Sequence, residues 1–359
     1  GGGQLSHRNL IINGAMQVAQ RSTSETGIGA AAGYFTLDRY RTTFSGTAGR
    51  LTMSQVADVH DGFANAMKLD CTTADTSVGA SEYFILQQKF EGQDLQQLKK
   101  GSSDAEEFTV SFYVKGNASA TYVVEMFDLD NSRQVSKTFS VTTSWTRVVL
   151  TFPADTTGAL DDDNNASLQL GIWLHAGSNY TSGTLNSSAF AAQTSAQRAG
   201  GISSFFDSTD RTFFLTGLQL EVGNTATTFE HRTYQEEILR CMRYYQQLTG
   251  DDRGYNGATG STGSFKNSVI GIYNTATDIR AIYYHMVPMR NEPTLTVLGA
   301  VSDFDLEPFD RAPSSIAMNR AGVFQSTLLI QDSGSATQGN AAQLTIDQAA
   351  GGLAFSAEL

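Results

Sequence analysis

The stretch GLQLEVGNTATTFEHRTYQEEILRCMRYY, residues 217–245, decides the organisation of the chain. Residues 217–222 alternate apolar and polar side chains, as the closing strand of a half-buried sheet does. A polar, glycine-bearing exit follows, and apolar side chains then recur at helical spacing. The stretch therefore predicts the end of one β domain, a sharp exit, and a short amphipathic helix that leads into a second domain.

The predicted helix runs from Tyr234 to Leu248. Thr233, with Glu236 three residues later, forms the capping-box pattern of a helix N-terminus. Apolar side chains then form a heptad-like stripe: Tyr234, Ile238, Cys241, Tyr245 and Leu248. Two interpretations remain open for this stripe. It could be an oligomer interface at a three-fold axis, or it could dock onto the adjacent β domain.

The regions on either side of the helix predict an all-β protein. Before the helix, runs of alternating polar and apolar residues are separated by turn clusters: 108–114, 122–127, 145–152, 168–174 and 213–222. Helical crossovers, which parallel sheets need, are missing between these runs, so an antiparallel sandwich is expected. After the helix, shorter runs predict a second, smaller β-sandwich: 269–273, 279–287, 295–298, 323–330, 343–346 and 353–359.

These patterns divide the chain into four segments. We expect a flexible Gly-rich hinge at 1–8, a jelly-roll β domain at 9–232, a linking helix at 233–249 and a C-terminal sandwich at 250–359. Cys71 and Cys241 lie in unrelated contexts, so they are interpreted as two buried thiols rather than as a disulfide.

The charge of the chain excludes some classes of partner. The net charge is -12, and only 17% of the 359 residues are charged. Binding to a nucleic-acid backbone or to an anionic membrane draws on clusters of Lys and Arg, so neither partner is expected. No window approaches the roughly 18 consecutive apolar residues that a membrane span needs. Sugars remain possible ligands, because they are bound by aromatic stacking and hydrogen bonds.

Several segments resemble known families. NLIINGAMQVAQRST (9–23), YFTLDRY (34–40), the 217–245 stretch, VPMRNEPT (287–294) and FSAEL (355–359) resemble bacteriophage tail-fibre and related virion proteins. NLIING (9–14), TSWTRVV (143–149) and FLTGLQLE (214–221) resemble strands that occur in this order in jelly-roll carbohydrate-binding modules. The resemblance implies a homotrimeric, extracellular fibre of the virion. Its partners would be other virion tail proteins and a host cell-surface polysaccharide or receptor.

Candidate ligand contacts follow from the chemistry of sugar binding, which uses exposed aromatic faces beside polar groups. The segment 175–186 is polar, aromatic and glycine-bearing, and Trp173 precedes it. Competing candidates lie in the C-terminal domain, because a tethered fibre presents its distal end to the host. The candidate residues are Trp173, His175, Tyr180 and Asn186 in the first domain, and Tyr283 and Tyr284 in the second.

Calcium is the one cofactor that the sequence suggests. The resemblance to carbohydrate-binding jelly rolls implies a Ca²⁺ ion beside the first and last strands, where Asn13 and Glu221 would be ligands. Asp161, Asp163 and Asn165 also begin like an EF-hand loop. That loop lacks the central glycine and the distal glutamate, because Ile172 stands at its twelfth position. A solvated acidic turn is the simpler interpretation.

No pattern in the sequence predicts catalysis. The five histidines are isolated, and neither a nucleophile elbow nor a phosphate-binding loop occurs. The resemblance to phage fibre proteins therefore implies a distal tail fibre that acts as a receptor-binding adhesin recognising a cell-surface glycan, and we expect no enzymatic activity. Two alternatives remain: a virion polysaccharide depolymerase, and a capsid head-fibre or decoration protein without receptor contact.

Overall fold

The chain divides into two structural units, both built mainly from antiparallel strands. A computed structural model describes residues 7–250 and 267–359. The first unit is Gly1–Tyr234 together with Leu359, and the second is Gln235–Glu358. Most of the predicted hinge at 1–8, and the start of the predicted domain at 250–359, lie outside the described residues. Among those described, no helix is long and apolar enough to cross a membrane.

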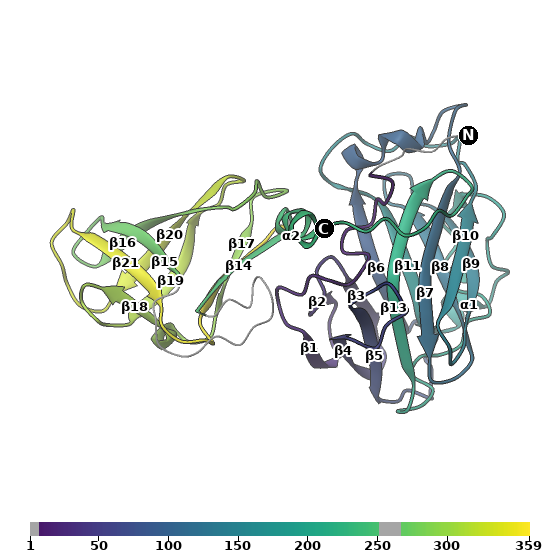
Figure 1. Cartoon of the computed structure of the whole chain (residues 1–359), viewed down its shortest axis with the longest axis horizontal. Coiled ribbons are helices and arrows are strands. Elements are labelled where there is room, and N and C mark those ends of the chain that lie inside the picture. The colour runs from purple at the N-terminus through teal and green to yellow at the C-terminus, as the bar shows by residue number, and fades with distance from the viewer. Residues whose placement is uncertain (1–6, 251–266) are drawn as a thin grey trace. The chain divides into compact units, whose positions relative to one another are not determined.

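The first unit is a jelly-roll β-sandwich of two sheets (Figure 1). One, the β7–β13 sheet, has six strands in this order: β1 (Ser24–Ile28), β4 (Arg50–Val56), β5 (Ala66–Thr73), β13 (Thr212–Val222), β7 (Phe108–Gly116) and β10 (Thr146–Phe152). The other, the β6–β11 sheet, has seven: β12 (Ala191–Ala192), β9 (Arg133–Val141), β8 (Ala120–Asp128), β11 (Ala166–Ala176), β6 (Tyr83–Glu91), β3 (Arg41–Ser45) and β2 (Gly33–Tyr34).

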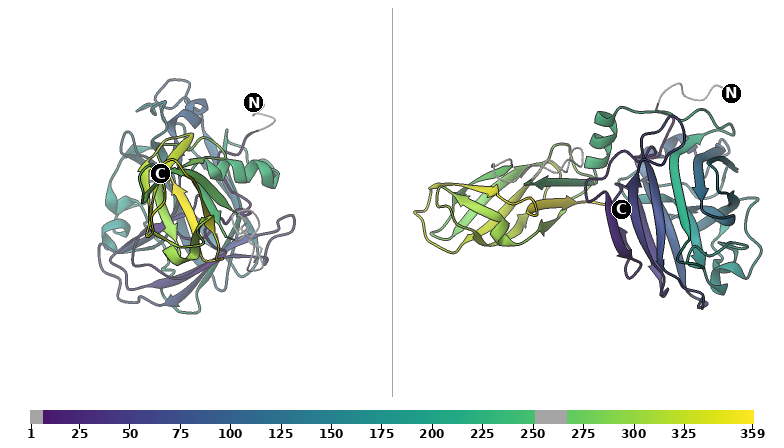
Figure 2. Two further views of the ribbon diagram at one scale, coloured as in Figure 1. Left: turned by 90° about the vertical axis from the view of Figure 1, so that its left-hand side faces the viewer. Right: turned by 60° about the horizontal axis from the view of Figure 1, so that its bottom comes forward.

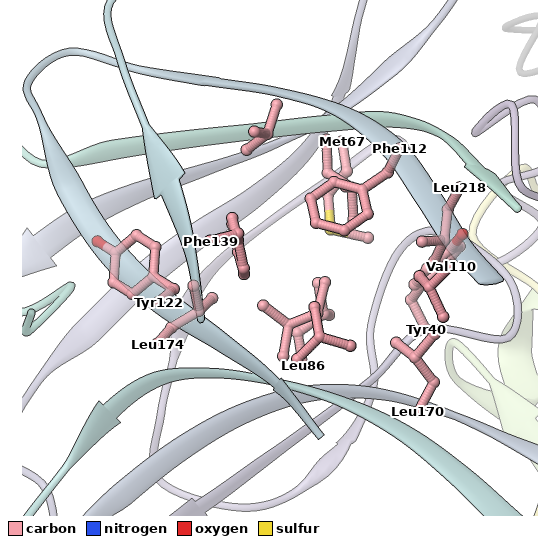
Figure 3. Packing of buried hydrophobic residues seen from close by; sticks show 14 of the residues in the cluster. Tyr40, Met67, Leu86, Val110, Phe112, Tyr122, Phe139, Leu170, Leu174 and Leu218 are labelled. Carbon is pink, nitrogen blue, oxygen red and sulfur yellow. The ribbon is translucent and has the colours of Figure 1, made fainter. Parts of the chain in front are cut away.

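One apolar core fills the space between these sheets. Met67 and Phe112 from the β7–β13 sheet, with Leu86 and Leu170 from the β6–β11 sheet, point into the same layer (Figure 3). The alternation read in the sequence produces this arrangement, because successive side chains of a strand point to opposite faces. Each large apolar side chain buried in this way contributes about 1.5–3 kcal/mol. The other face of the β6–β11 sheet carries polar and aromatic residues together with the aliphatic side chains of Ile85 and Val123.

The short elements of the first unit lie in its loops. They are η1 (Gly92–Asp94), η2 (Gln96–Leu98), α1 (Ser178–Thr181) and η3 (Ser195–Gln197). The opening segment 10–12, expected as a strand, is a loop instead. The Asn9 side chain takes the place of a strand ladder there, since its Oδ1 accepts from Ile11 and Leu220 and its Nδ2 donates to Leu218.

The helix prediction is correct at its start and wrong at its end. Helix α2 spans Tyr234–Met242 (Figure 2), and strand β14 follows at Tyr245–Thr249. β14 pairs with β22 near the C-terminus, so Tyr245 and Leu248 lie on a strand and not on a fifteen-residue helix. The C-terminal β unit consequently begins before residue 250. Ile238 and Cys241 are 2% and 0% exposed, whereas Tyr234 is 40% exposed. Of the three stripe residues that lie on α2, only Tyr234 therefore offers surface to an oligomer partner, and the oligomer interface stays a prediction.

The second unit contains two sheets around one apolar core. The smaller sheet has three strands: β14, β22 (Gly352–Ser356) and β17 (Thr294–Leu298). The larger has six: β18 (Phe304–Glu307), β21 (Ala341–Ile346), β15 (Ser268–Tyr273), β16 (Asp278–Tyr284), β20 (Gln325–Asp332) and β19 (Pro313–Arg320). A short 3-10 turn, η4 (Val301–Asp303), precedes β18. The chain is therefore all-β, with short helices between its strands.

Candidate functional site

The outer face of the β6–β11 sheet contains a groove, which is the candidate site. Its volume is about 310 Å³. Three neighbouring strands form its floor, and the segment 180–198 forms one side. The lining residues are Arg41 and Thr43 of β3; Tyr83, Ile85, Gln87 and Lys89 of β6; Gln169 and Trp173 of β11; and Tyr180, Gln193, Ser195 and Arg198.

Strand register explains why this face is hollow. Gly171 of β11 pairs with Gln87 of β6 on one side and with Glu125 of β8 on the other. Glycine has no side chain, so no side chain fills the middle of the groove floor at this position. A Cβ atom at Gly171 would lie 3.1 Å from the side chain of Ile85, which is a tight contact. The groove thus depends on a small residue between two strands that carry long side chains.

A buried ion pair fixes Trp173 at one end of the groove. Trp173 Nε1 donates to Glu125 Oε2 at 2.9 Å, and Arg198 donates from Nε and Nη2 to the two Glu125 oxygens, both at 2.7 Å. Glu125 is fully buried. Burial alone would lower the pKa of Arg198, but the hydrogen bond and charge of Glu125 hold that pKa above its ordinary value. Arg198 is therefore a charged structural clamp on the indole ring, 4.9 Å from its centre.

Two tyrosines complete an aromatic cluster with Trp173. The rings of Tyr83 and Tyr180 meet edge to face with centroids 5.3 Å apart, and Tyr180 lies 5.3 Å from Trp173. Trp173 itself is 0% exposed, whereas both tyrosines are partly exposed. Tyr83 and Tyr180 are consequently the rings that present surface to a ligand, and Trp173 supports them from below.

The charge of the groove is opposite to that of the chain. Arg41, Lys89 and Arg198 line it, together with the amides of Gln87 and Gln169 and others, and none of its lining residues carries a carboxylate. The whole chain has a net charge of -12. Positive side chains are therefore concentrated at this concave surface, where an anionic group of a ligand would be favoured.

The structure brings some of the predicted contact residues together and separates others. Trp173 and Tyr180 both line the groove, although Trp173 is 0% exposed and only Tyr180 presents surface to it. His175 is 0% exposed and faces the core, so its prediction as a surface contact is wrong. Asn186 lies outside the groove lining, because its Nδ2 donates to Gln134 O at 2.8 Å and fixes the loop to β9.

The two candidates in the second unit have different surroundings. Tyr283 stacks on Phe355 with ring centroids 4.4 Å apart, which makes it part of the core of that unit. Tyr284 is 69% exposed on β16. Tyr284 therefore remains a possible contact by exposure, although it is not among the residues that line the groove.

The expected calcium ligands are engaged with protein donors. Asn13 Oδ1 accepts from Val18 N at 2.9 Å, and its Nδ2 donates to backbone oxygens of Val18 and Asp38. Glu221 accepts from Thr227 through its backbone and hydroxyl groups, at 2.9 and 2.8 Å. These bonds give both side chains a structural role, and the calcium site at this position stays a prediction.

Sequence reasoning missed most of the groove. Tyr83, Gln87 and Lys89 occupy alternate positions of the run YFILQQKF (83–90), and all three point to the same face. An aromatic, an amide and a cation on the solvent side of one strand are an unusual set, and this was the available signal. Arg198 could not have been found in this way, because its partner Glu125 is 73 residues away.

Comparisons with known proteins find only distant likeness to solved structures. No family model matches the chain, and no curated protein matches it. Similar solved structures include one described as "CBM4 structure and function" (12% identity, TM-score 0.29, covering 58% of this chain and 97% of that one). The CBM22-1 xylan-binding domain from Paenibacillus barcinonensis Xyn10C is 12% identical with a TM-score of 0.30, and the match covers 63% of this chain and 98% of that one. The enzymatically active domain of Bacteriophage CBA120 tailspike protein 4 is 10% identical with a TM-score of 0.31, and the match covers 60% of this chain and 21% of that one. Likeness at this level says nothing about what the groove binds.

Proposed function

We propose that the groove of the β6–β11 sheet binds an acidic cell-surface polysaccharide, and that the chain is a receptor-binding part of a bacteriophage fibre. The observation that carries the binding proposal is the combination of partly exposed rings, amides and cations in one groove without a lining carboxylate. The virion role is supported by the resemblance of segments 9–23, 34–40 and 217–245 to phage fibre proteins.

The groove chemistry matches a sugar chain. Tyr83 and Tyr180 offer partly exposed rings for the apolar faces of sugars, and the Gln87 and Gln169 amides can both donate to and accept from hydroxyl groups. Such a site buries little area per sugar, so each contact is weak. A homotrimeric fibre would compensate through multivalency, since three linked sites gain avidity without new contacts.

The cations select the acidic class of glycan. Arg41 lies across from Gln87 in the strand register, and Gln169 lies across from Lys89, so positive groups flank the amides along the groove. A hexuronic acid carries its carboxylate on the sugar ring, where such a cation can reach it. Charge-assisted hydrogen bonds of this kind contribute about 1.5–3 kcal/mol each.

Isothermal titration with hexuronate oligosaccharides and with neutral hexose oligosaccharides of equal length tests the binding proposal. We expect the acidic ligand to bind more tightly, with an affinity that falls as salt is raised. Arg41→Gln and Lys89→Gln should each weaken acidic binding about tenfold, which corresponds to about 1.4 kcal/mol. Tyr180→Ala should weaken binding of acidic and neutral ligands alike. Arg280→Gln, in the second unit, is the matched control and should change nothing.

Two outcomes of these measurements would contradict the binding proposal. Equal affinity for acidic and neutral ligands, or unchanged affinity in the Arg41 and Lys89 variants, would remove the acidic class. If Tyr284→Ala abolishes binding while the groove variants do not, the binding site lies in the second unit.

We propose binding without catalysis. Glycoside hydrolysis generally needs two carboxyl groups on either side of the scissile bond, about 5–9.5 Å apart. The residues lining the groove supply no such pair. Loss of viscosity when host polysaccharide is incubated with the chain would instead support the depolymerase alternative.

The fibre proposal has its own tests. Light scattering of the purified 38.6 kDa chain should give the mass of three chains. The purified protein should also bind host cells and block adsorption of the virus. A protein that does neither would fit a capsid decoration protein better.

A further inference from the structure

Three potential metal ligands meet behind the groove, at the end of the first unit's sandwich. Asp75, Glu82 and His175 each bring one ligand atom into a group whose members all lie within 4.8 Å of one another. Asp75 follows β5, Glu82 immediately precedes β6, and His175 is near the end of β11. The cluster is separate from Asn13 and Glu221, where the family resemblance places calcium.

A β-bulge turns His175 toward this cluster. Trp173 pairs with Ile85, but His175 pairs with Phe84, so Leu174 is the extra residue on β11. Phe84 belongs to the core, and His175 meets the core ring of Phe206 edge to face at 5.4 Å. Without the bulge, His175 would share the outer face with Trp173.

The Asp75 carboxylate and the Glu82 backbone are held in place by separate segments. The Asp75 carboxylate accepts from Thr47 Oγ1 at 2.7 Å and from Ala48 N at 2.8 Å. The backbone of Glu82 is fixed twice, since Glu82 N donates to Gly79 O at 3.1 Å and Gly177 N donates to Glu82 O at 2.8 Å. The ligand set is therefore preorganised rather than placed on a free loop.

Two atoms in the cluster lack a hydrogen-bond partner among the described residues. His175 Nε2 and Glu82 Oε2 are both buried and unpaired, and they face each other at 3.7 Å. That separation is too long for a hydrogen bond. The His175 side chain is 0% exposed, and that of Glu82 is 17% exposed. Burying a nitrogen and a carboxylate oxygen without hydrogen bonds is costly, and a cation between them would satisfy both.

We propose that Asp75, Glu82 and His175 bind a divalent transition-metal ion of the zinc class. One imidazole nitrogen with two carboxylate oxygens is a donor set that zinc accepts, whereas calcium prefers oxygen ligands alone. Two ligand atoms about 2.1 Å from one ion, at an angle of about 110–120°, lie about 3.4–3.6 Å apart. The observed 3.7 Å needs only a small adjustment.

The outer contacts of His175 agree with a ligand role. Its Nδ1 lies 2.8 Å from Ser204 Oγ, and this oxygen also accepts from Phe206 N at 3.1 Å. An Nδ1–H that donates to Ser204 leaves the lone pair on Nε2, directed at the cluster, as in many metal-binding histidines. The ion would tie the end of β11 to the start of β6, beside Trp173 and Tyr83 at one end of the groove.

Metal uptake by the full chain tests this site directly. The protein is stripped with chelator, incubated with Zn²⁺ alone, desalted and analysed by mass spectrometry for metal content. We expect one Zn²⁺ per chain, and a rise in the melting temperature on the order of 5–10 °C at saturating metal. Co²⁺ in place of Zn²⁺ should give visible absorption bands that report coordination independently of stability.

Two variants and one control separate this site from surface binding. Glu82→Gln keeps the side-chain shape and should lose the bound ion and the Co²⁺ bands, and His175→Gln should do the same. His285→Gln is the matched control, because His285 Nε2 also lies 3.0 Å from a serine hydroxyl, Ser326, yet belongs to no such cluster. No uptake by the unmodified chain, or uptake that survives both substitutions, would overturn the proposal.

Discussion

Replacing Glu125 with glutamine should destabilise the first unit strongly, because this carboxylate is buried and holds two partners. Glu125 accepts two hydrogen bonds from Arg198 and one from Trp173. A glutamine has one acceptor oxygen, and its amide would place an N–H against another N–H. Breaking one side of a buried ion pair costs about 3–5 kcal/mol, and one bond to a charged group about 1.5–3 kcal/mol. We therefore expect a loss of about 3 kcal/mol.

Urea unfolding followed by tryptophan fluorescence measures this loss in the first unit alone. The chain has two tryptophans, Trp145 and Trp173, and both belong to that unit. The midpoint should fall while the slope stays the same. The variant Arg198→Met should have a similar effect. The double variant should lose less than the sum of the two, with a coupling of about 2 kcal/mol.

An exposed pair supplies the control for this measurement. Glu106 bonds Lys99 at 2.7 Å, with side chains 42% and 52% exposed. Glu106→Gln should leave the midpoint unchanged, since solvent screens exposed pairs. If Glu125→Gln costs under about 0.5 kcal/mol, and its effect simply adds to that of Arg198→Met, then the pair is solvated and does not clamp Trp173.

Three further changes have definite expected outcomes. Gly217→Ala should cost the first unit about 2–3 kcal/mol in urea unfolding, because Gly217 has φ +61° and a Cβ would lie 2.6 Å from the Phe63 ring. A hydrogen bond from Arg311 lowers the pKa of Asp332 to about 2. The stabilisation by ionised Asp332 is therefore present above about pH 4 and is lost as pH falls toward 2. Hydrogen exchange in β19 and β20 should report this loss of protection at low pH, and Asp332→Asn should make the protection less dependent on pH. Burial raises the pKa of Cys71 to about 11, so iodoacetamide should modify Cys71 only in unfolded protein, as detected by peptide mass spectrometry.

The sequence was informative wherever the strand pattern was regular. Alternation along 168–174 predicted β11, because a strand between a core and an outer face must swap side-chain types at each residue. The helix start at Tyr234 was also correct, since a capping box is a local signal. Both predictions depend on residues that are close together in the chain.

The end of that helix could not be read in the same way. Apolar spacing at Tyr245 and Leu248 continues the helical pattern, yet these residues pair with Ser356 and Leu353 in β22. A strand partner more than a hundred residues away competes with helix formation, and local spacing carries no sign of it. Tertiary pairing decided the structure of this segment.

In the candidate site too, local patterns could be read from the sequence and effects of strand register could not. Tyr180 and Trp173 could be named as candidates because an aromatic residue beside a polar loop is a local pattern. His175 was placed on the wrong face, because one bulge between Trp173 and His175 shifts the register and reverses the direction of a side chain. A bulge of a single residue leaves no reliable mark in the sequence.

The charge of the groove connects these observations. A net charge of -12 disfavours the approach of anions, so the proposed anionic ligand is expected where cations are concentrated. Arg198 is paired with Glu125, and Arg41 and Lys89 are the other cations that line the groove. Removing the clamp would disturb the aromatic rings, whereas removing Arg41 or Lys89 would change the charge and leave the rings in place. The two kinds of variant should therefore separate recognition of sugar faces from recognition of acidic groups in the same groove.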